Sequence, residues 1–221
     1  VLPDGYTAGP GGIELILSTL NRTVYDGEDS MTVTIPEGGS SAGYTLLMPS
    51  TQAYSWEVRY DCRYWYCGDE ESTAKYIAIG WYDGPSAPTA FSPPGSPLWA
   101  GTNHSNIVLT LIKANSIRGR VTLPRPAPTG GLSLQVDAYD PSPVVAAFSS
   151  RSFTIPQGGT AANYSVQVPD RTSLSWRVNY RIFTKPSGYI PLGYYAATGT
   201  THVESSGTIL AGGIEQTNIN L

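Results

Sequence analysis

The chain has little of the chemistry on which most enzymes and metal proteins depend. Its 221 residues include two cysteines and two histidines, which leaves few side chains for metal binding or nucleophilic catalysis. Charged residues make up 14% of the sequence, well below the usual value of about 25%. Lys and Arg number 13 against 17 Asp and Glu, a net charge of −4, and this excludes the basic surface of a nucleic-acid binder. We also expect no membrane insertion, because the sequence has no run of about 18 apolar residues.

Glycine, proline and tyrosine are abundant instead. The sequence holds 24 Gly, 18 Pro and 15 Tyr, and 40% of its residues are hydrophobic. Turn residues combined with aromatics favour strands over helices, and the apolar content is sufficient for folded cores. The composition therefore predicts an all-β protein.

The two halves of the sequence resemble each other. The stretch Ile-Pro-Glu-Gly-Gly-Ser-Ser-Ala-Gly-Tyr at 35–44 returns as Ile-Pro-Gln-Gly-Gly-Thr-Ala-Ala-Asn-Tyr at 155–164, an offset of 120. A Ser-Trp-x-Val-x-Tyr pattern recurs at the same offset, at 55–60 and 175–180. Agreement at several ordered points predicts an internal duplication.

The duplication divides the chain into two predicted domains, residues 1–114 and 115–221. The second opens with Ile117–Pro124, whereas the first opens with Val1–Pro3 and lacks a counterpart of the preceding strand residues. The first domain is therefore expected to begin inside a strand, and we interpret the sequence as a piece of a larger polypeptide.

Alternation of apolar and polar residues marks the expected strands. In the first half they are expected at about 13–18, 31–35, 44–48, 55–61, 75–82 and 107–112. Trp56 and Trp176 alternate in phase with Val58 and Val178, which predicts that both tryptophans belong to the core. About seven short strands per domain are typical of an antiparallel sandwich of immunoglobulin-like or transthyretin-like type.

Two short stretches resemble known sandwich domains. Ile117-x-Gly119-x-Val121, followed by a proline-rich turn and the strand 131–136, resembles the opening of carboxypeptidase-regulatory-like sandwiches. The Ile-Pro-x-Gly-Gly-x-x-x-x-Tyr stretch resembles strand–turn–strand segments of bacterial extracellular repeats. The resemblance implies a secreted, extracellular location and a role as a spacer, carbohydrate-binding module or adhesin unit.

One strand of each half carries candidate ligand-binding tyrosines. Side chains of two kinds alternate along the strand 76–82. We assign the large apolar residues Ile77, Ile79 and Trp81 to the core. The opposite face carries Tyr76, Gly80 and Tyr82, and we expect it to face water. The corresponding strand of the second half has Tyr189 and Tyr195 in the same places. A glycine between two tyrosines leaves a shallow floor, and apolar sugar faces stack on aromatic rings. This pattern predicts a sugar-binding face.

Polar residues join this face if the strand 55–61 pairs with it. They are Glu57 and Arg59 in the first half and Arg177 and Asn179 in the second, and such groups bond sugar hydroxyls. Two alternatives stay open. The tyrosines form cross-strand pairs or pack under a loop or the other domain, or they support strand addition by a partner at a sheet edge.

Both cysteines lie in an insertion that the second half lacks. We predict a hairpin tip closed by a Cys62–Cys67 disulfide, since an even cysteine count in a turn-rich chain is typical of an oxidising compartment. Tyr64 and Trp65 lie between the cysteines. If exposed they form a recognition surface, and the alternative is that they pack against the neighbouring domain.

The predicted function is that of a non-catalytic carbohydrate-binding tandem module of a larger secreted protein, with a polysaccharide or glycan as partner. We expect no cofactor, no metal site and no catalytic residues. The alternative is a structural spacer or adhesin segment without a small-molecule ligand. Acidic turns at 26–29 and 137–140 have oxygen ligands suited to Ca²⁺, but ordinary turn chemistry is the better explanation of both.

Overall fold

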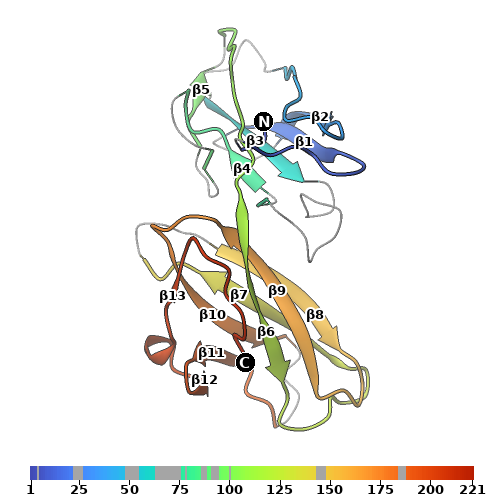
Figure 1. Ribbon diagram of the computed structural model, residues 1–221, viewed down its shortest axis with the longest axis vertical. Coiled ribbons are helices and arrows are strands. Elements are labelled where there is room, and N and C mark those ends of the chain that lie inside the picture. The colour runs from blue at the N-terminus through green and yellow to red at the C-terminus, as the bar shows by residue number, and fades with distance from the viewer. Residues whose placement is uncertain are drawn as a thin grey trace. The chain divides into compact units, whose positions relative to one another are not determined.

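The chain divides into two compact units, Val1–Ala114 and Asn115–Leu221 (Figure 1). The structure is a computed structural model, and it describes residues 1–3, 5–21, 27–47, 55–62, 76–77, 79–85, 89–90, 95–99, 101–142, 148–183 and 188–221. Regular structure in these residues consists of strands, apart from the single-turn 3-10 helix η3 (Glu204–Ser206). The predicted all-β class is confirmed.

The first unit contains one antiparallel sheet with the strand order β2-β1-β3-β4. Its strands are β1 (Ile13–Asn21), β2 (Gly27–Ile35), β3 (Ser55–Cys62) and β4 (Ile79–Trp81), and the short strand β5 (Leu98–Trp99) pairs with β3. The apolar alternation of β1 and β3 places Leu15, Leu17, Val58 and Tyr60 in one buried cluster. Their side chains share a face because successive residues of a strand point to opposite sides.

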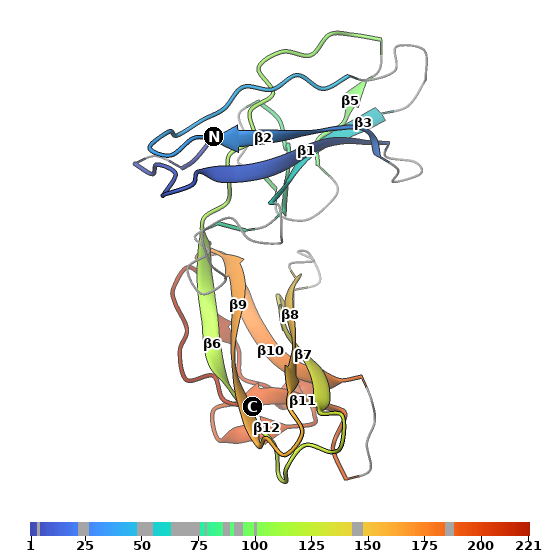
Figure 2. The same cartoon turned by 90° about the vertical axis from the view of Figure 1, so that its right-hand side faces the viewer.

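The second unit has two sheets. One has the order β12-β11-β10-β7-β8, with β13 paired to β10, and the other pairs β6 with β9. The bounds are β6 Ala114–Thr122, β7 Leu132–Tyr139, β8 Phe148–Ile155, β9 Ala161–Pro169, β10 Ser175–Ile182, β11 Leu192–Ala196, β12 Gly199–Thr201 and β13 Leu210–Ala211. Figure 2 shows β6 beside β9. Leu134, Val136 and Val178 are fully buried, and Ile117 and Val121 of β6 are buried as well.

Positions that the sequence aligns make the same pairs in the two units. Trp56 is opposite Leu98 in the first unit, and Trp176 is opposite Leu210 in the second. Both tryptophans are buried, at 0% and 1% exposure, so their predicted core position is confirmed.

Two strands expected in the first unit do not form. Residues 41–47 and 105–112 are extended but belong to no ladder, and Met48 lies outside the described residues. Their counterparts in the second unit are β9 and the segment 216–221, which lie on either side of β6. Among the described residues of the first unit, no strand pairs with either segment, and a ladder needs such a partner.

The expected strand 75–82 is shorter than predicted. It consists of β4 and an isolated bridge between Tyr76 and Lys113.

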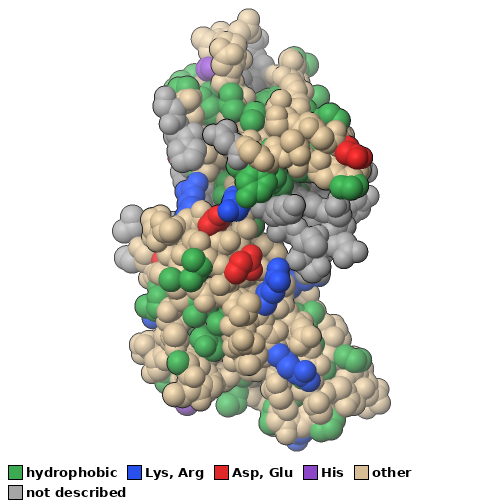
Figure 3. All heavy atoms as spheres, in the orientation of Figure 1, with side chains coloured by type: hydrophobic (Ala, Val, Ile, Leu, Met, Phe, Trp, Pro, Cys, Tyr) green, Lys and Arg blue, Asp and Glu red, His purple; other side chains and the backbone are tan. Residues whose placement is uncertain are grey.

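Charged side chains of both signs are scattered among polar and hydrophobic groups on the face of the molecule drawn in Figure 3.

Candidate functional site

The tyrosines predicted to bind a ligand in the first unit are buried. Tyr76 is 4% exposed and Tyr82 is 5% exposed, and both belong to the core cluster. Gly80 is opposite Tyr60 in the β3–β4 pair, and opposite residues of an antiparallel pair point to the same face. The two tyrosines therefore share the core face with Tyr60, and the prediction that they face water is wrong.

The glycine between these tyrosines accommodates another tyrosine ring. A Cβ atom on Gly80 would overlap the Tyr60 ring, with the Tyr60 Cζ atom at 2.7 Å. Gly193 has the same relation to Tyr180, with Cζ at 2.8 Å. In both units the missing side chain makes room for an internal packing contact, and no floor for a flat ligand results.

Tyr189 and Tyr195 of the second unit are half-buried. The Tyr189 hydroxyl donates a hydrogen bond to the Pro126 carbonyl oxygen at 2.8 Å. The Arg125 guanidinium lies over the Tyr189 ring, 4.8 Å from its centroid. One face of that ring is therefore already covered by a side chain of the same unit.

Glu57 and Arg59 lie on the outer face of β3, opposite to the core tyrosines, because they alternate with Val58 and Tyr60. Arg59 Nε is 3.0 Å from Asp61 Oδ2, and Glu57 is only 1% exposed. The predicted combination of these polar groups with outward-facing tyrosines is wrong for the first unit.

The outer face of the second unit carries connected polar side chains. Asn179 is opposite Asp137 in the β10–β7 pair, and they are 2% and 0% exposed. Arg181 Nε is 3.0 Å from Asp137 Oδ2, and Gln135 donates a hydrogen bond to Asp137 Oδ1 at 2.5 Å. Burial raises the pKa of the Asp137 carboxyl, and the Gln135 and Arg181 contacts oppose that rise only in part.

Helix η3 completes this polar face. The Tyr139 hydroxyl donates a hydrogen bond to Glu204 Oε1 at 2.6 Å, and Arg177 Nη1 is 3.7 Å from the same oxygen. Of the predicted ligand-binding residues on this face, Arg177 contacts Glu204. Asn179 is buried beside Asp137, and its Oδ1 atom has no hydrogen-bond partner among the described residues.

The prediction for the aromatic loop tip concerns residues that the structure does not describe. Tyr64, Trp65 and Cys67 lie outside the described residues. Cys62 ends β3 and is 6% exposed within the core cluster. The Cys62–Cys67 disulfide and the recognition role of the tip stay predictions.

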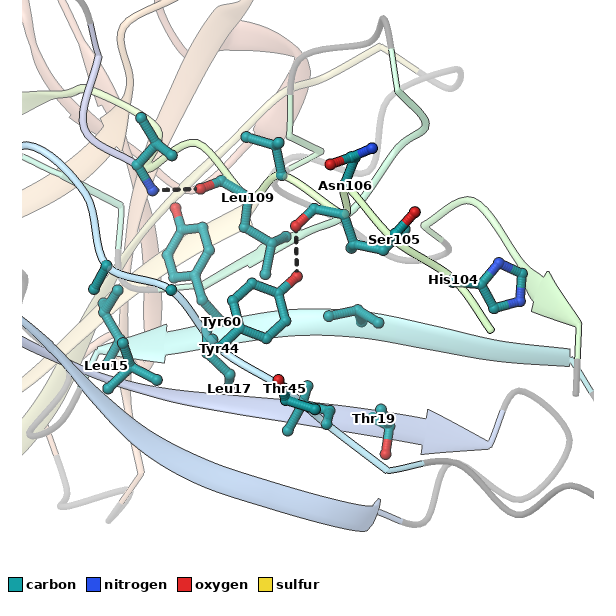
Figure 4. A pocket seen from close by; sticks show the side chains of 18 of the residues that line it. Leu15, Leu17, Thr19, Tyr44, Thr45, Tyr60, His104, Ser105, Asn106 and Leu109 are labelled. Carbon is teal, nitrogen blue, oxygen red and sulfur yellow. Dashed lines mark hydrogen bonds between the residues drawn. The ribbon is translucent and has the colours of Figure 1, made fainter. Parts of the chain in front are cut away.

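A groove opens into the core of the first unit. Its volume is about 480 Å³, and residues 42–46 and 104–109 line it together with strand side chains. Figure 4 shows Leu15, Leu17 and Tyr60 of the sheet beside the segment that carries His104 to Leu109. Apolar side chains of the lining are Leu15, Leu17, Val33, Val58, Leu98 and Leu109.

Two hydrogen bonds connect the walls of this groove. The Tyr44 hydroxyl donates to the Ile107 carbonyl oxygen at 2.8 Å, and the Val1 amino group donates to the Leu109 carbonyl oxygen at 2.8 Å (Figure 4). Burial, with a smaller contribution from Tyr82, raises the pKa of Tyr44 to about 12. Within the described part of the chain, no backbone–backbone hydrogen bond joins residues 41–46 to another segment, so their peptide groups are available to a further strand.

Sequence reasoning misses this groove. Alternation predicts strands at 44–48 and 107–112, and residues 44–46 and 107–109 line the groove. A pattern along one segment does not show whether a neighbouring strand covers it, so no feature of the sequence predicts the opening.

No three His, Cys, Asp or Glu side chains of the described residues are grouped closely enough to hold a metal ion. His104 Nε2 is 2.9 Å from the Trp99 carbonyl oxygen and 3.0 Å from Thr102 Oγ1, so its ring is engaged locally. The described segments also contain no helix with the length and apolar character needed to cross a membrane.

Comparison with family models, curated proteins and solved structures finds no match to this chain. Its function therefore has to be argued from the arrangement of its own residues.

Proposed function

We propose that the chain is a non-catalytic structural segment, a spacer or adhesin segment of a larger extracellular protein, made of two β-sandwich units related by duplication. One observation carries the proposal: the side chains best suited to ligand binding are used for internal packing. Tyr76 and Tyr82 are in the core, and Arg59 pairs with Asp61. Arg181 similarly pairs with Asp137.

Such use of polar side chains is typical of a scaffold. A ligand site needs polar groups whose bonds are completed by the ligand. On the outer face of the second unit, Tyr139 and Arg177 both contact Glu204. A sugar would have to displace these contacts before it could bind, and the energy lost would offset much of the energy gained.

Glycan binding by the second unit is the second candidate. The side chain of Tyr189 is half-buried, and this partial exposure favours the candidate. The Arg125 guanidinium lies 4.8 Å from the ring centroid and covers one face, so a sugar would use the other. Tyr195, also half-buried, would assist. A pyranose would stack on the Tyr189 ring, and Arg125 would bond its hydroxyls.

Affinity electrophoresis of the full chain through gels that contain soluble polysaccharides separates the two proposals. The spacer proposal predicts unchanged mobility in every gel. Retardation that is lost in Tyr189→Ala would contradict it and support the glycan candidate. The matched control is Ile190→Ala, which trims a neighbouring side chain that is 60% exposed without removing an aromatic ring.

A further inference from the structure

We propose that the second unit is built to carry tension along the chain, and that the hydrogen-bond ladder between β6 and residues 216–221 is the part that resists it. We refer to this ladder as the parallel ladder. The inference rests on the spacer role, because tension passes through a segment that connects other parts of a protein. It goes beyond that role by naming the bonds that determine mechanical strength.

The two segments of the parallel ladder run in the same direction. Ile117 and Gln216 form a parallel bridge, and the bonding continues to the pair Thr122 and Leu221. Figure 1 marks the C-terminus beside the end of β6. The chain enters the second unit at Asn115, so Asn115 and Leu221 lie at opposite ends of the ladder.

This arrangement loads the ladder in shear. A molecule held at two points turns until those points lie along the line of force. Tension between Asn115 and Leu221 therefore pulls β6 and residues 216–221 along their own axes in opposite directions. Every bond of the ladder then carries part of the load, and the bonds must break together. Forced unfolding is governed by the unfolding rate, and that rate falls when more bonds have to break in one step.

The ladder contains five backbone hydrogen bonds, with N···O distances between 2.7 and 3.0 Å. They join the pairs Ser116–Gln216, Gln216–Arg118, Arg118–Ile219, Arg120–Leu221 and Leu221–Thr122. Side chains extend it at two places. The Ser116 amide donates to Glu215 Oε1 at 3.2 Å, and the Arg120 amide donates to Asn220 Oδ1 at 3.1 Å.

Apolar side chains shield these bonds from water. Ile117 and Val121 of β6 are 0% and 3% exposed. Ile219 and Leu221 of the facing segment are 4% and 8% exposed. A hydrogen bond is stronger where water is excluded, so the buried side of the ladder favours resistance to sliding.

Both segments of the ladder are also tied to the rest of the unit. The Tyr164 hydroxyl donates to the Ile219 carbonyl oxygen at 2.6 Å, and Asn115 Nδ2 donates to Asp170 Oδ1 at 2.8 Å. A Cβ atom on Gly119 would overlap the Ile219 carbonyl oxygen, so the glycine lets the two segments approach. Neither segment can slide without breaking further contacts.

Direction separates a ladder that bears load from one that only stabilises the fold. Thermal stability has no direction, whereas a parallel ladder is strong in shear and weak when it is peeled from one end. Peeling loads one hydrogen bond at a time, and a single bond contributes little to stability on its own.

Single-molecule force spectroscopy of the full chain tests this difference. One handle is attached at the C-terminus, and the other at an azide-bearing amino acid placed at Lys113 or at Pro124, which are both exposed. The Lys113 handle precedes the ladder and loads it in shear. The Pro124 handle lies at the same end of the ladder as Leu221 and peels residues 216–221 from β6. We expect the unfolding force to be about twofold higher or more with the Lys113 handle.

A variant of the ladder and a variant of the core complete the test. Arg118→Pro removes the amide that donates to Gln216, because proline has no N–H, and it should reduce the ratio of the two forces. Val136→Ala empties a fully buried site outside the ladder, so it should lower thermal stability and keep the ratio. The parent chain decides the question even where Arg118→Pro does not fold. Equal forces in the two directions, or an unchanged ratio in a folded Arg118→Pro, would overturn the proposal. Affinity electrophoresis tests the spacer role separately, so failure of that role and failure of the ladder give different results.

Discussion

Gly80 and Gly193 illustrate how a residue can be assigned correctly to a strand and wrongly to a role. Each sits opposite a tyrosine of the neighbouring strand, and the ring of that tyrosine occupies the space that a side chain would need. Alternation grouped Gly80 with Tyr76 and Tyr82 correctly. It could not identify the core face, because the other face carries apolar residues of similar size.

Substitution of Gly193 by alanine should destabilise the second unit. The new Cβ atom would overlap the Tyr180 ring, and overpacking of this kind costs about 1–3 kcal/mol. Urea denaturation of the full chain measures the loss. The control is Gly43→Ala, where no atom lies within 4 Å of the new Cβ atom. We expect that variant to change stability by less than about 0.5 kcal/mol, and equal effects of the two changes would refute this packing role.

The raised pKa of Asp137 predicts that its contribution to folding stability falls as the pH rises. An ordinary ion-paired carboxylate has a lowered pKa and shows the opposite dependence. Burial raises the folded-state pKa of Asp137, so the unfolded chain loses the proton at a lower pH than the folded chain. The stability that the protonated form provides is lost as the pH rises through the folded pKa. Asp137→Asn cannot ionise and should therefore gain stability relative to the parent chain between about pH 3 and pH 7.

Thermal unfolding of both proteins across this pH range measures the difference. A stability gap between Asp137→Asn and the parent chain that shrinks toward neutral pH would contradict the assignment.

At the scale of elements, alternation predicted the strands around Ile13, Met31, Ser55 and Ser175, because each has a polar or irregular face opposite an apolar one. It also predicted strands at 44–48 and 107–112. The described residues of these ranges, 44–47 and 107–112, are extended without a ladder. A strand is defined by its partner, and a sequence pattern reports only one member of the pair. The strands β5, β12 and β13 contain two or three residues, too few to show a period.

Amide exchange should report the missing ladder directly. The amide of Ile219 bonds the Arg118 carbonyl oxygen at 3.0 Å, whereas the amide of Ile107 makes no backbone–backbone bond to another described residue. We expect Ile107 to exchange about tenfold or more faster than Ile219 in the unliganded chain. Nuclear magnetic resonance resolves the two amides, and equal protection would mean that the groove wall is already paired.

At the scale of the whole molecule, the chain forms two compact all-β units. A groove of about 480 Å³ opens into the core of the first. The composition of the sequence predicted the all-β class. It could not show which side chains the groove exposes, since that depends on how residues 104–109 pack.

The first unit should lose its structure at a lower temperature than the second. Less apolar surface is buried where the groove opens, and burial is the main source of stability. Brief proteolysis at increasing temperature, followed by mass spectrometry of the fragments, measures the temperature at which each unit unfolds. Loss of the second unit first would contradict the interpretation that the first core is incomplete.

The most direct measurement is affinity electrophoresis of the full chain through gels that contain soluble polysaccharides. Because Tyr76 and Tyr82 are in the core and Arg125 covers one face of the Tyr189 ring, we predict unchanged mobility in every gel. Retardation that is lost in Tyr189→Ala and kept in Ile190→Ala would contradict the claim that these side chains serve internal packing.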